Sequence, residues 1–335
     1  MEPFIDPFWL PVIFAGLMGL SILLYVILDG YDLGVGMLSA LARGEERDLM
    51  VASIGPFWDA NETWLVLGIG LLLVAFPIAH GIILTQLYLP VFVMLAGLIL
   101  RGVAFEFRAK AEPNRKHLWD KSFIGGSLMA TLAQGYMLGA YILGFDQSLG
   151  AVLFCLLAAA GLAAGYVFVG ACWLIYKTEG ALQERSVRWA RLGLWATAAA
   201  MAAVSLVTPL LSQRIFDRWF SLPEIIALLP IPMMSAVLFI GLAIFLSRPK
   251  RHDDALSWVP LAGAGTLFAL GFIGIAYSFY PYVIPDRLDI WQAAASPEAL
   301  SIILVGTVFV LPVILGYSLL AHWIFRGKAT HLSYY

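Results

Sequence analysis

Long apolar runs, each long enough to cross a lipid bilayer, recur along the whole of this 335-residue chain. Crossing the hydrocarbon core takes about 20 mostly apolar residues. We find nine such runs, which lie near 9–28, 58–78, 82–102, 122–145, 150–176, 190–212, 222–247, 257–280 and 299–325. The runs predict an all-α polytopic membrane protein with nine transmembrane helices.

Composition supports a membrane protein and argues against other classes. Charged residues make up 13% of the chain and hydrophobic residues 61%, whereas a soluble domain carries about 25% charged residues. The net charge of −2 gives no basis for binding nucleic acid.

The first apolar run has no clear end in the sequence. Apolar character continues from Trp9 to Ala42, so either the first helix projects beyond the membrane or Asp29 and Asp32 lie inside it. We expect a tight turn around Pro77, His80 and Gly81 to join the second and third helices.

The distribution of basic residues predicts the orientation. With the N-terminus outside, the inside segments contain 17 of the 20 Lys and Arg residues, in groups of two, six, four, three and two, and the other three lie outside. Short loops rich in Lys and Arg stay in the cytoplasm, so the sequence predicts an N-out, C-in orientation in an inner (cytoplasmic) membrane. The inside residues are Arg43, Arg47, Arg101, Arg108, Lys110, Arg115, Lys116, Lys121, Lys177, Arg185, Arg188, Arg191, Arg248, Lys250, Arg251, Arg326 and Lys328.

The runs also predict the domain organisation. We expect one transmembrane domain over residues 1–335, with a first four-helix bundle at 9–145, a second at 150–280 and a ninth helix at 299–325.

Ionisable residues gather at the predicted cytoplasmic ends of the first three helices. Because charged groups are costly in a membrane, they are functional candidates. They are the acids Asp29, Asp32, Asp59, Glu62 and Glu106 and the arginines Arg101 and Arg108. As a functional site they would form a proton entry point, since carboxylates in a partly dry site have raised pKa values and can relay protons. As a structural feature they would be ion pairs, with Arg101 and Arg108 neutralising acids at helix ends.

Histidine positions argue against a haem in this chain. A membrane haem needs axial ligands, usually His or Met, deep in a helix bundle. We expect His80 in a turn, His117, His252 and His331 in loops or the tail, and only His322 inside a helix. We therefore predict no haem and no metal site in this chain.

Several motifs resemble one family, subunit II of the cytochrome bd-type quinol oxidases. Ordered motifs at Asp29–Leu38, Ser53–Trp64, Arg101–Arg108 and Phe279–Pro285 are similar to its first-helix end, second-helix entry, third-helix exit and the segment before its last helix. Chain length and nine spans also agree, and the compact length resembles the cyanide-insensitive branch. Phe57 is a departure, because some members have His there, so a proton role of that His cannot transfer.

The resemblance implies a heterodimer that oxidises quinol, reduces O2 to water and takes its protons from the cytoplasm. Subunit I would hold two haem b groups and one haem d, and this chain would hold none. In members of the family, the acid at the position of Asp59 is implicated in a proton pathway at the subunit interface, so the resemblance implies this role for Asp59. A bound quinone near Trp58 and Trp64 is implied for some members; the alternative for these residues is an aromatic belt at the membrane surface. Further partners would be lipid and a small accessory subunit.

Two other functions fit the sequence less well. A secondary transporter would have broken helices at mid-membrane in both halves, whereas the acids here lie in one half and toward one face. A purely structural scaffold would make no use of Asp59 in proton transfer.

Overall fold

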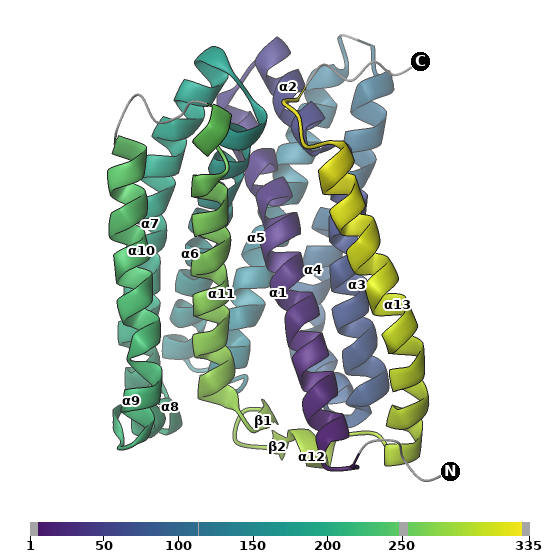
Figure 1. Cartoon of the computed structure of the whole chain (residues 1–335), viewed down its shortest axis with the longest axis vertical. Helices are drawn as coiled ribbons and strands as arrows, with labels where there is room; N and C mark the ends of the chain where they lie inside the picture. The colour runs from purple at the N-terminus through teal and green to yellow at the C-terminus, as the bar shows by residue number, and fades with distance from the viewer. Residues whose placement is uncertain (1–5, 113, 248–253, 330–335) are drawn as a thin grey trace. The chain divides into compact units, whose positions relative to one another are not determined.

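The computed structural model describes residues 6–112, 114–247 and 254–329, and they are mostly helical (Figure 1). Arg248, Lys250, Arg251, His252 and His331 lie outside the described residues. The helices are α1 (Trp9–Leu38), α2 (Glu45–Ile54), α3 (Trp58–Ala75), α4 (Pro77–Lys110), α5 (Lys116–Ile142), α6 (Leu149–Lys177), α7 (Gly180–Leu211), α8 (Gln213–Phe220), α9 (Glu224–Leu228), α10 (Pro230–Ser247), α11 (Val259–Phe279), α12 (Ile290–Ala293) and α13 (Pro297–Ile324). Two 3-10 turns, η1 (Ser39–Leu41) and η2 (Asp254–Leu256), and the antiparallel strands β1 (Tyr282–Ile284) and β2 (Leu288–Asp289) complete the described structure.

Eight helical segments in the described part of the chain are long and apolar enough to cross a membrane. They are Trp9–Leu41, Trp58–Ala75, Pro77–Lys110, Leu149–Lys177, Gly180–Leu211, Glu224–Ser247, Val259–Phe279 and Pro297–Ile324. The protein is therefore an all-α, multi-pass membrane protein. The predicted span at 122–145 coincides with α5, a 27-residue helix that lacks a membrane-length stretch as apolar as those of the eight.

The structure defines the end of the first helix, which the sequence left open, and differs from two other expectations. α1 runs unbroken from Trp9 through Asp29 and Asp32 to Leu38. The third helix does not end at 102, since α4 continues to Lys110. The turn between α3 and α4 is Phe76 alone, which leaves Pro77 and His80 inside α4. Proline fits the first turn of a helix, where its missing N–H has no partner to lose.

The chain forms two compact units, and each draws on separated stretches of sequence. The first consists of residues 1–29, 56–87 and 279–326, and the second of residues 30–55, 88–278 and 327–335. α1 and α4 contribute to both. α4 is kinked at Leu87, three residues before Pro90, because a proline within a helix removes one backbone hydrogen bond and crowds the preceding turn.

In the first unit α3 packs against α13, and a backbone hydrogen bond from Ala295 to Ala75 ties the segment before α13 to the end of α3. In the second unit α6 packs between α5 and α7, and α10 packs on α7 (Figure 1). Small residues bring these helices close: an added Cβ at Gly135 would lie 2.5 Å from the Cα of Ala159, so α5 and α6 touch backbone to backbone there.

Candidate functional site

The two acids of α1 are fully buried. Asp29 and Asp32 are both 0% exposed, one turn apart in an otherwise apolar helix. Burying a carboxylate in a protein interior is costly, and ionisable residues inside membrane-spanning segments are rare. These two positions are therefore strong candidates for a functional role.

Glycines bring the second half of α1 against its neighbours. A Cβ at Gly34 would overlap the carbonyl oxygen of Tyr166 in α6, and one at Gly36 would overlap the hydroxyl of Ser127 in α5. Between the two buried acids, the Tyr31 ring stacks on that of Trp173 in α6, with centroids 4.0 Å apart. This stretch of α1 is therefore held tightly in the second unit.

α3 has two distinct faces at its N-terminal end. On the inner face Phe57, Asn61 and Trp64 are buried. Asn61 Nδ2 donates to the carbonyl of Leu28 in α1 (3.4 Å), and Trp64 Nε1 donates to Ser318 Oγ in α13 (3.3 Å). These residues recur at a helical spacing of three to four, which places them on one face.

The acid of α3 lies on the opposite face. Asp59 is exposed, as are Thr63 and Val66 farther along the same side. Glu62 and Trp58 are partly exposed. Asp59 therefore points away from the packing of the first unit, whereas Trp64 is fully enclosed within it.

His322 completes the packing at this end of the first unit. Its ring lies 4.7 Å from that of Phe57, and its Nδ1 is 2.8 Å from the carbonyl oxygen of Ser318. A carbonyl only accepts, so Nδ1 carries the hydrogen and donates it.

The three predicted residues of α4 differ in their surroundings. Arg101 is 1% exposed and Arg108 is 6% exposed, whereas Glu106 is exposed. Arg108 pairs with Asp48 and Asp120, two acids that sequence analysis did not single out.

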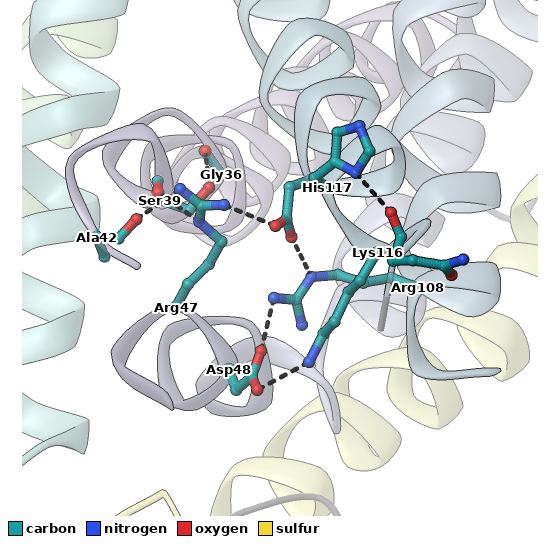
Figure 2. Close-up of polar contacts among 10 residues, drawn as sticks. Gly36, Ser39, Ala42, Arg47, Asp48, Arg108, Lys116 and His117 are labelled. Carbon is teal, nitrogen blue, oxygen red and sulfur yellow. Dashed lines mark hydrogen bonds and ion pairs between the residues drawn. The ribbon is translucent and has the colours of Figure 1, made fainter. Parts of the chain in front are cut away.

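Arg108 is the centre of a cluster of five charged residues, Arg47, Asp48, Arg108, Lys116 and Asp120, which we call the charge cluster (Figure 2). Its Nε donates to Asp120 Oδ1 and its Nη2 to Asp48 Oδ1, both at 2.6 Å. Arg47 Nη1 donates to Asp120 Oδ2 (2.6 Å), and Lys116 Nζ to Asp48 Oδ2 (2.8 Å). Arg47 Nε also donates to the carbonyl of Ser39 (2.9 Å).

The charge cluster joins four elements of the second unit. It ties α2 to α4 and α5, and Arg47 adds η1 through the carbonyl of Ser39, its first residue. A further pair, between Arg185 of α7 and Glu46 of α2 (2.9 Å), holds the other side of α2. The short helix between α1 and α3 is thus fixed by ion pairs.

The pKa of the Asp48 carboxyl lies below its usual value of 3.8. Burial raises it, but the hydrogen bonds and positive charges of Lys116 and Arg108 together outweigh burial. A lowered folded-state pKa means that the pairing of Asp48 stabilises the protein above about pH 4 and that this stabilisation is lost as the pH falls through the lowered pKa.

Sequence analysis missed the charge cluster because its residues look like a solvated charge run. Arg47 and Asp48 stand in the polar stretch after the first apolar run. Arg108 was predicted as an ion-pairing residue, but its partners were not identified. Among them Asp120, which is 9% exposed, carries a usable signal, since it lies at the edge of an apolar run with basic residues on both sides.

No group of three or more His, Cys, Asp or Glu side chains that could hold a metal ion occurs among the described residues. The arrangement of the site is instead that of carboxylates and arginines, which can hold and exchange protons or form ion pairs.

Comparison with known proteins decides the family. The family model of cytochrome bd terminal oxidase subunit II matches residues 10–325. The chain belongs to this family. The match covers all eight candidate spans almost completely, so the resemblance predicted from the motifs is confirmed, and the protein is a subunit of a cytochrome bd quinol oxidase.

Individual relatives agree. The chain is 27% identical over 327 residues to cytochrome bd ubiquinol oxidase subunit 2 of Bacillus subtilis, covering 92% of this chain and 93% of that protein. It is 28% identical over 359 residues to cytochrome bd-I ubiquinol oxidase subunit 2 of Escherichia coli, covering 94% and 93%.

A solved structure shows the same fold. The bd oxidase from Geobacillus thermodenitrificans contains a chain that matches with a TM-score of 0.75 and 18% identity, over 95% of this chain and 99% of that one. The family name implies haem in the assembled oxidase and a subunit I as partner.

Proposed function

We propose that this chain is the haem-free subunit II of a quinol oxidase of the bacterial inner membrane and that it provides a proton route to the oxygen-reducing site. The oxidase would oxidise quinol, reduce O2 to water and generate a proton motive force. Two haem b groups and one haem d would reside in subunit I, because haem needs opposed axial ligands and this chain has few histidines to offer.

The observation that carries the proton route is the burial of Asp29 and Asp32 in α1. Two carboxyl groups that lie one turn apart and are shielded from solvent are placed to relay a proton within the membrane-spanning part of the chain. Asp59 would supply the entry, since it lies on the exposed face of α3, the helix that Asn61 joins to α1.

Exposure of Asp59 also suggests where subunit I binds. A carboxylate on the outside of a membrane-spanning helix needs water, headgroups or a protein partner around it. We propose that this face of α3 meets subunit I, so that Asp59 lies between the subunits. We also propose that Glu62 and Glu106 collect protons at the cytoplasmic surface. Arg101 and Arg108 would have a structural role in ion pairs, such as those of Arg108 with Asp48 and Asp120.

Membrane topology follows from the same assignment. We propose nine spans, which are the eight candidates and α5. They would have an N-out, C-in orientation and form two four-helix bundles, with α13 as the last span. The polar residues of α5 support this: Ser127 and Thr131 are buried and donate to carbonyls of their own helix, and Gln134 accepts from Tyr166 (2.8 Å). Leu128 and Leu132 are exposed and suited to lipid.

For a bound quinone we propose a contact with Trp58. Trp58 is partly exposed, whereas Trp64 is fully enclosed and its indole N–H is occupied by Ser318. Lipid and a small accessory subunit would be further partners.

Substitution of Asp59 tests the proton route. In the purified complex with subunit I, Asp59→Asn keeps the shape of the side chain and removes its ability to ionise. Removing a positioned proton-transfer group typically costs at least about 100-fold in rate, and we expect quinol-driven O2 consumption to fall by that order with haem content unchanged. Thr63→Ala, on the same exposed face, is the matched control and should keep the wild-type rate. An Asp59→Asn complex as active as wild type from pH 6 to 9 would refute the entry role.

A further inference from the structure

A short amphipathic helix, α8, lies between two membrane-spanning segments of the second unit. It follows the end of α7, and α9 leads from it into α10 (Figure 1). Ser212 caps it by accepting a hydrogen bond from the backbone N–H of Ile215 (3.4 Å). Ile215 is buried, whereas Phe216 and Phe220 on the same helix are exposed.

The exposed apolar surface continues past α8. Leu222, Ile226 and Leu229 are exposed by 76%, 67% and 51%. They lie just before and at the start of the candidate span Glu224–Ser247, and α8 directly follows the candidate span Gly180–Leu211. We therefore expect them near the level where these spans leave the hydrocarbon core. A helix with an apolar outer face and basic residues at this level is typical of one that lies in the membrane surface.

Hydrogen bonds fix α8 against the end of α11. Arg214 Nη1 donates to the carbonyl of Ser278 (2.8 Å), and Trp219 Nε1 donates to Ser278 Oγ (2.8 Å). Arg214 therefore satisfies a carbonyl at the C-terminus of α11, where a cation is favourable.

The second arginine of α8 is held differently. The guanidinium of Arg218 lies over the ring of Tyr277, 5.2 Å from the centroid, and its buried Nε makes no hydrogen bond within the described part of the chain. The acids near it in sequence are engaged by neutral groups: Asp217 accepts from Gln213 (2.8 Å) and Glu224 from Ser221 (3.0 Å). The Arg218 side chain is partly exposed. Its positive charge is not neutralised by any carboxylate of the described residues.

We propose that α8 binds the phosphodiester headgroup of an acidic phospholipid through Arg218, with Phe216 and Phe220 against the acyl chains. A guanidinium is planar and presents paired N–H groups that match phosphate oxygens. The Tyr277 ring holds this guanidinium in place, which reduces the entropy lost on binding. An acidic lipid fits better than a zwitterionic one because no ammonium group of its own competes for the phosphate.

Lipid binding to the purified two-subunit complex tests the proposal. Native mass spectrometry of the complex titrated with phosphatidylglycerol, phosphatidylcholine or inorganic phosphate measures each affinity separately. We expect wild type to bind phosphatidylglycerol about fivefold more tightly than phosphatidylcholine, the contribution of roughly one basic residue at a membrane surface. Arg218→Gln should abolish this preference, and Arg218→Lys should retain most of it because the charge remains.

Arg287→Gln provides the control. It removes the same charge from an exposed residue in the turn between β1 and β2, and the lipid preference should survive. An unchanged preference in Arg218→Gln, an equal loss in Arg287→Gln, or inorganic phosphate binding as tightly as the lipid would each overturn the proposal. The haem spectrum of each variant should be unaltered, which shows that the complex has assembled. Lipid binding is measured without turnover, so these outcomes do not depend on the proton route.

Discussion

Among single residues, the glycines of α1 show most clearly how a side chain determines helix packing. Gly34 lies directly against the backbone of α6, at Tyr166 and Gly170, with no room for a side chain. Gly16, in the same helix, has no atom within 4 Å of an added Cβ. The same residue type is therefore indispensable at one position and replaceable at the other.

Gly34→Ala should destabilise the protein by at least about 2 kcal/mol, because the new methyl group forces two helix backbones apart. Thermal unfolding of the detergent-solubilised complex should show a lower midpoint. Gly16→Ala is the matched control and should leave the midpoint unchanged or raise it slightly, since alanine is the better helix former. Equal midpoints for the two variants would show that α1 does not pack as described.

Sequence reasoning identified Asp29 and Asp32 as candidates but could not place them. The apolar pattern continues on both sides of the pair, so it fits either a helix that ends before Asp29 or one that passes through. The outcome depends on packing against α5 and α6, which are more than 80 residues away in sequence. The apolar pattern of one segment does not show which distant helices it will pack against.

At the level of helices, α2 shows how ion pairs substitute for apolar packing. Only its second half, from Met50 to Ile54, is buried. Its first turn holds Glu46 and Asp48, which pair with Arg185 on one side and with Arg108 and Lys116 on the other. The charge cluster includes a nearly buried arginine, whereas the Arg185–Glu46 pair is about one-third exposed.

Arg108→Gln should therefore cost much more stability than Arg185→Gln. Removing one partner of a buried pair leaves uncompensated charge and costs about 3–5 kcal/mol, while an exposed pair contributes at most about 1 kcal/mol. Chemical or thermal unfolding of the two variants in the same complex measures the difference. A smaller effect for Arg108→Gln than for Arg185→Gln would mean that the charge cluster does not hold α2.

α5 illustrates a limit of hydropathy as a guide to spans. Its polar residues reduce its mean hydropathy, yet Ser127, Thr131 and Gln134 are buried against neighbouring helices or bonded to their own backbone. Sequence reasoning predicted a span at 122–145 because the apolar residues there were numerous enough, but could not tell which face the polar ones would occupy. The charge cluster could not be predicted from the sequence either, since α2, α4 and α5 come together only in the folded chain.

For the molecule as a whole, the sequence predicted an all-α protein that crosses the membrane many times. Eight helical segments meet the criteria of length and apolarity in the described residues, and the family match covers all of them, whereas nine crossings stay a prediction. The compact units, however, combine both ends of the chain with its early helices. That arrangement could not be read from consecutive runs, because it depends on α13 returning to α3.

Cysteine labelling on either side of α5 distinguishes nine crossings from eight. The native Cys155 and Cys172 are buried and should not react. With nine spans and the N-terminus outside, Gln147→Cys should react with a membrane-impermeant maleimide in intact cells that have a permeable outer envelope, and Asn114→Cys only after the inner membrane is opened. Both positions are exposed. Labelling of both from the same side would show that α5 does not cross.

The most direct test of the proton route is proton uptake itself. The complex can be reconstituted in liposomes with a pH-sensitive dye on the cytoplasmic side, fully reduced and then exposed to a pulse of O2. If Asp29 and Asp32 lie on the route, the Asp29→Asn and Asp32→Asn complexes should take up protons at least about 100 times more slowly than wild type, with haem content unchanged. Uptake at the wild-type rate in both variants and in the double variant would contradict the account.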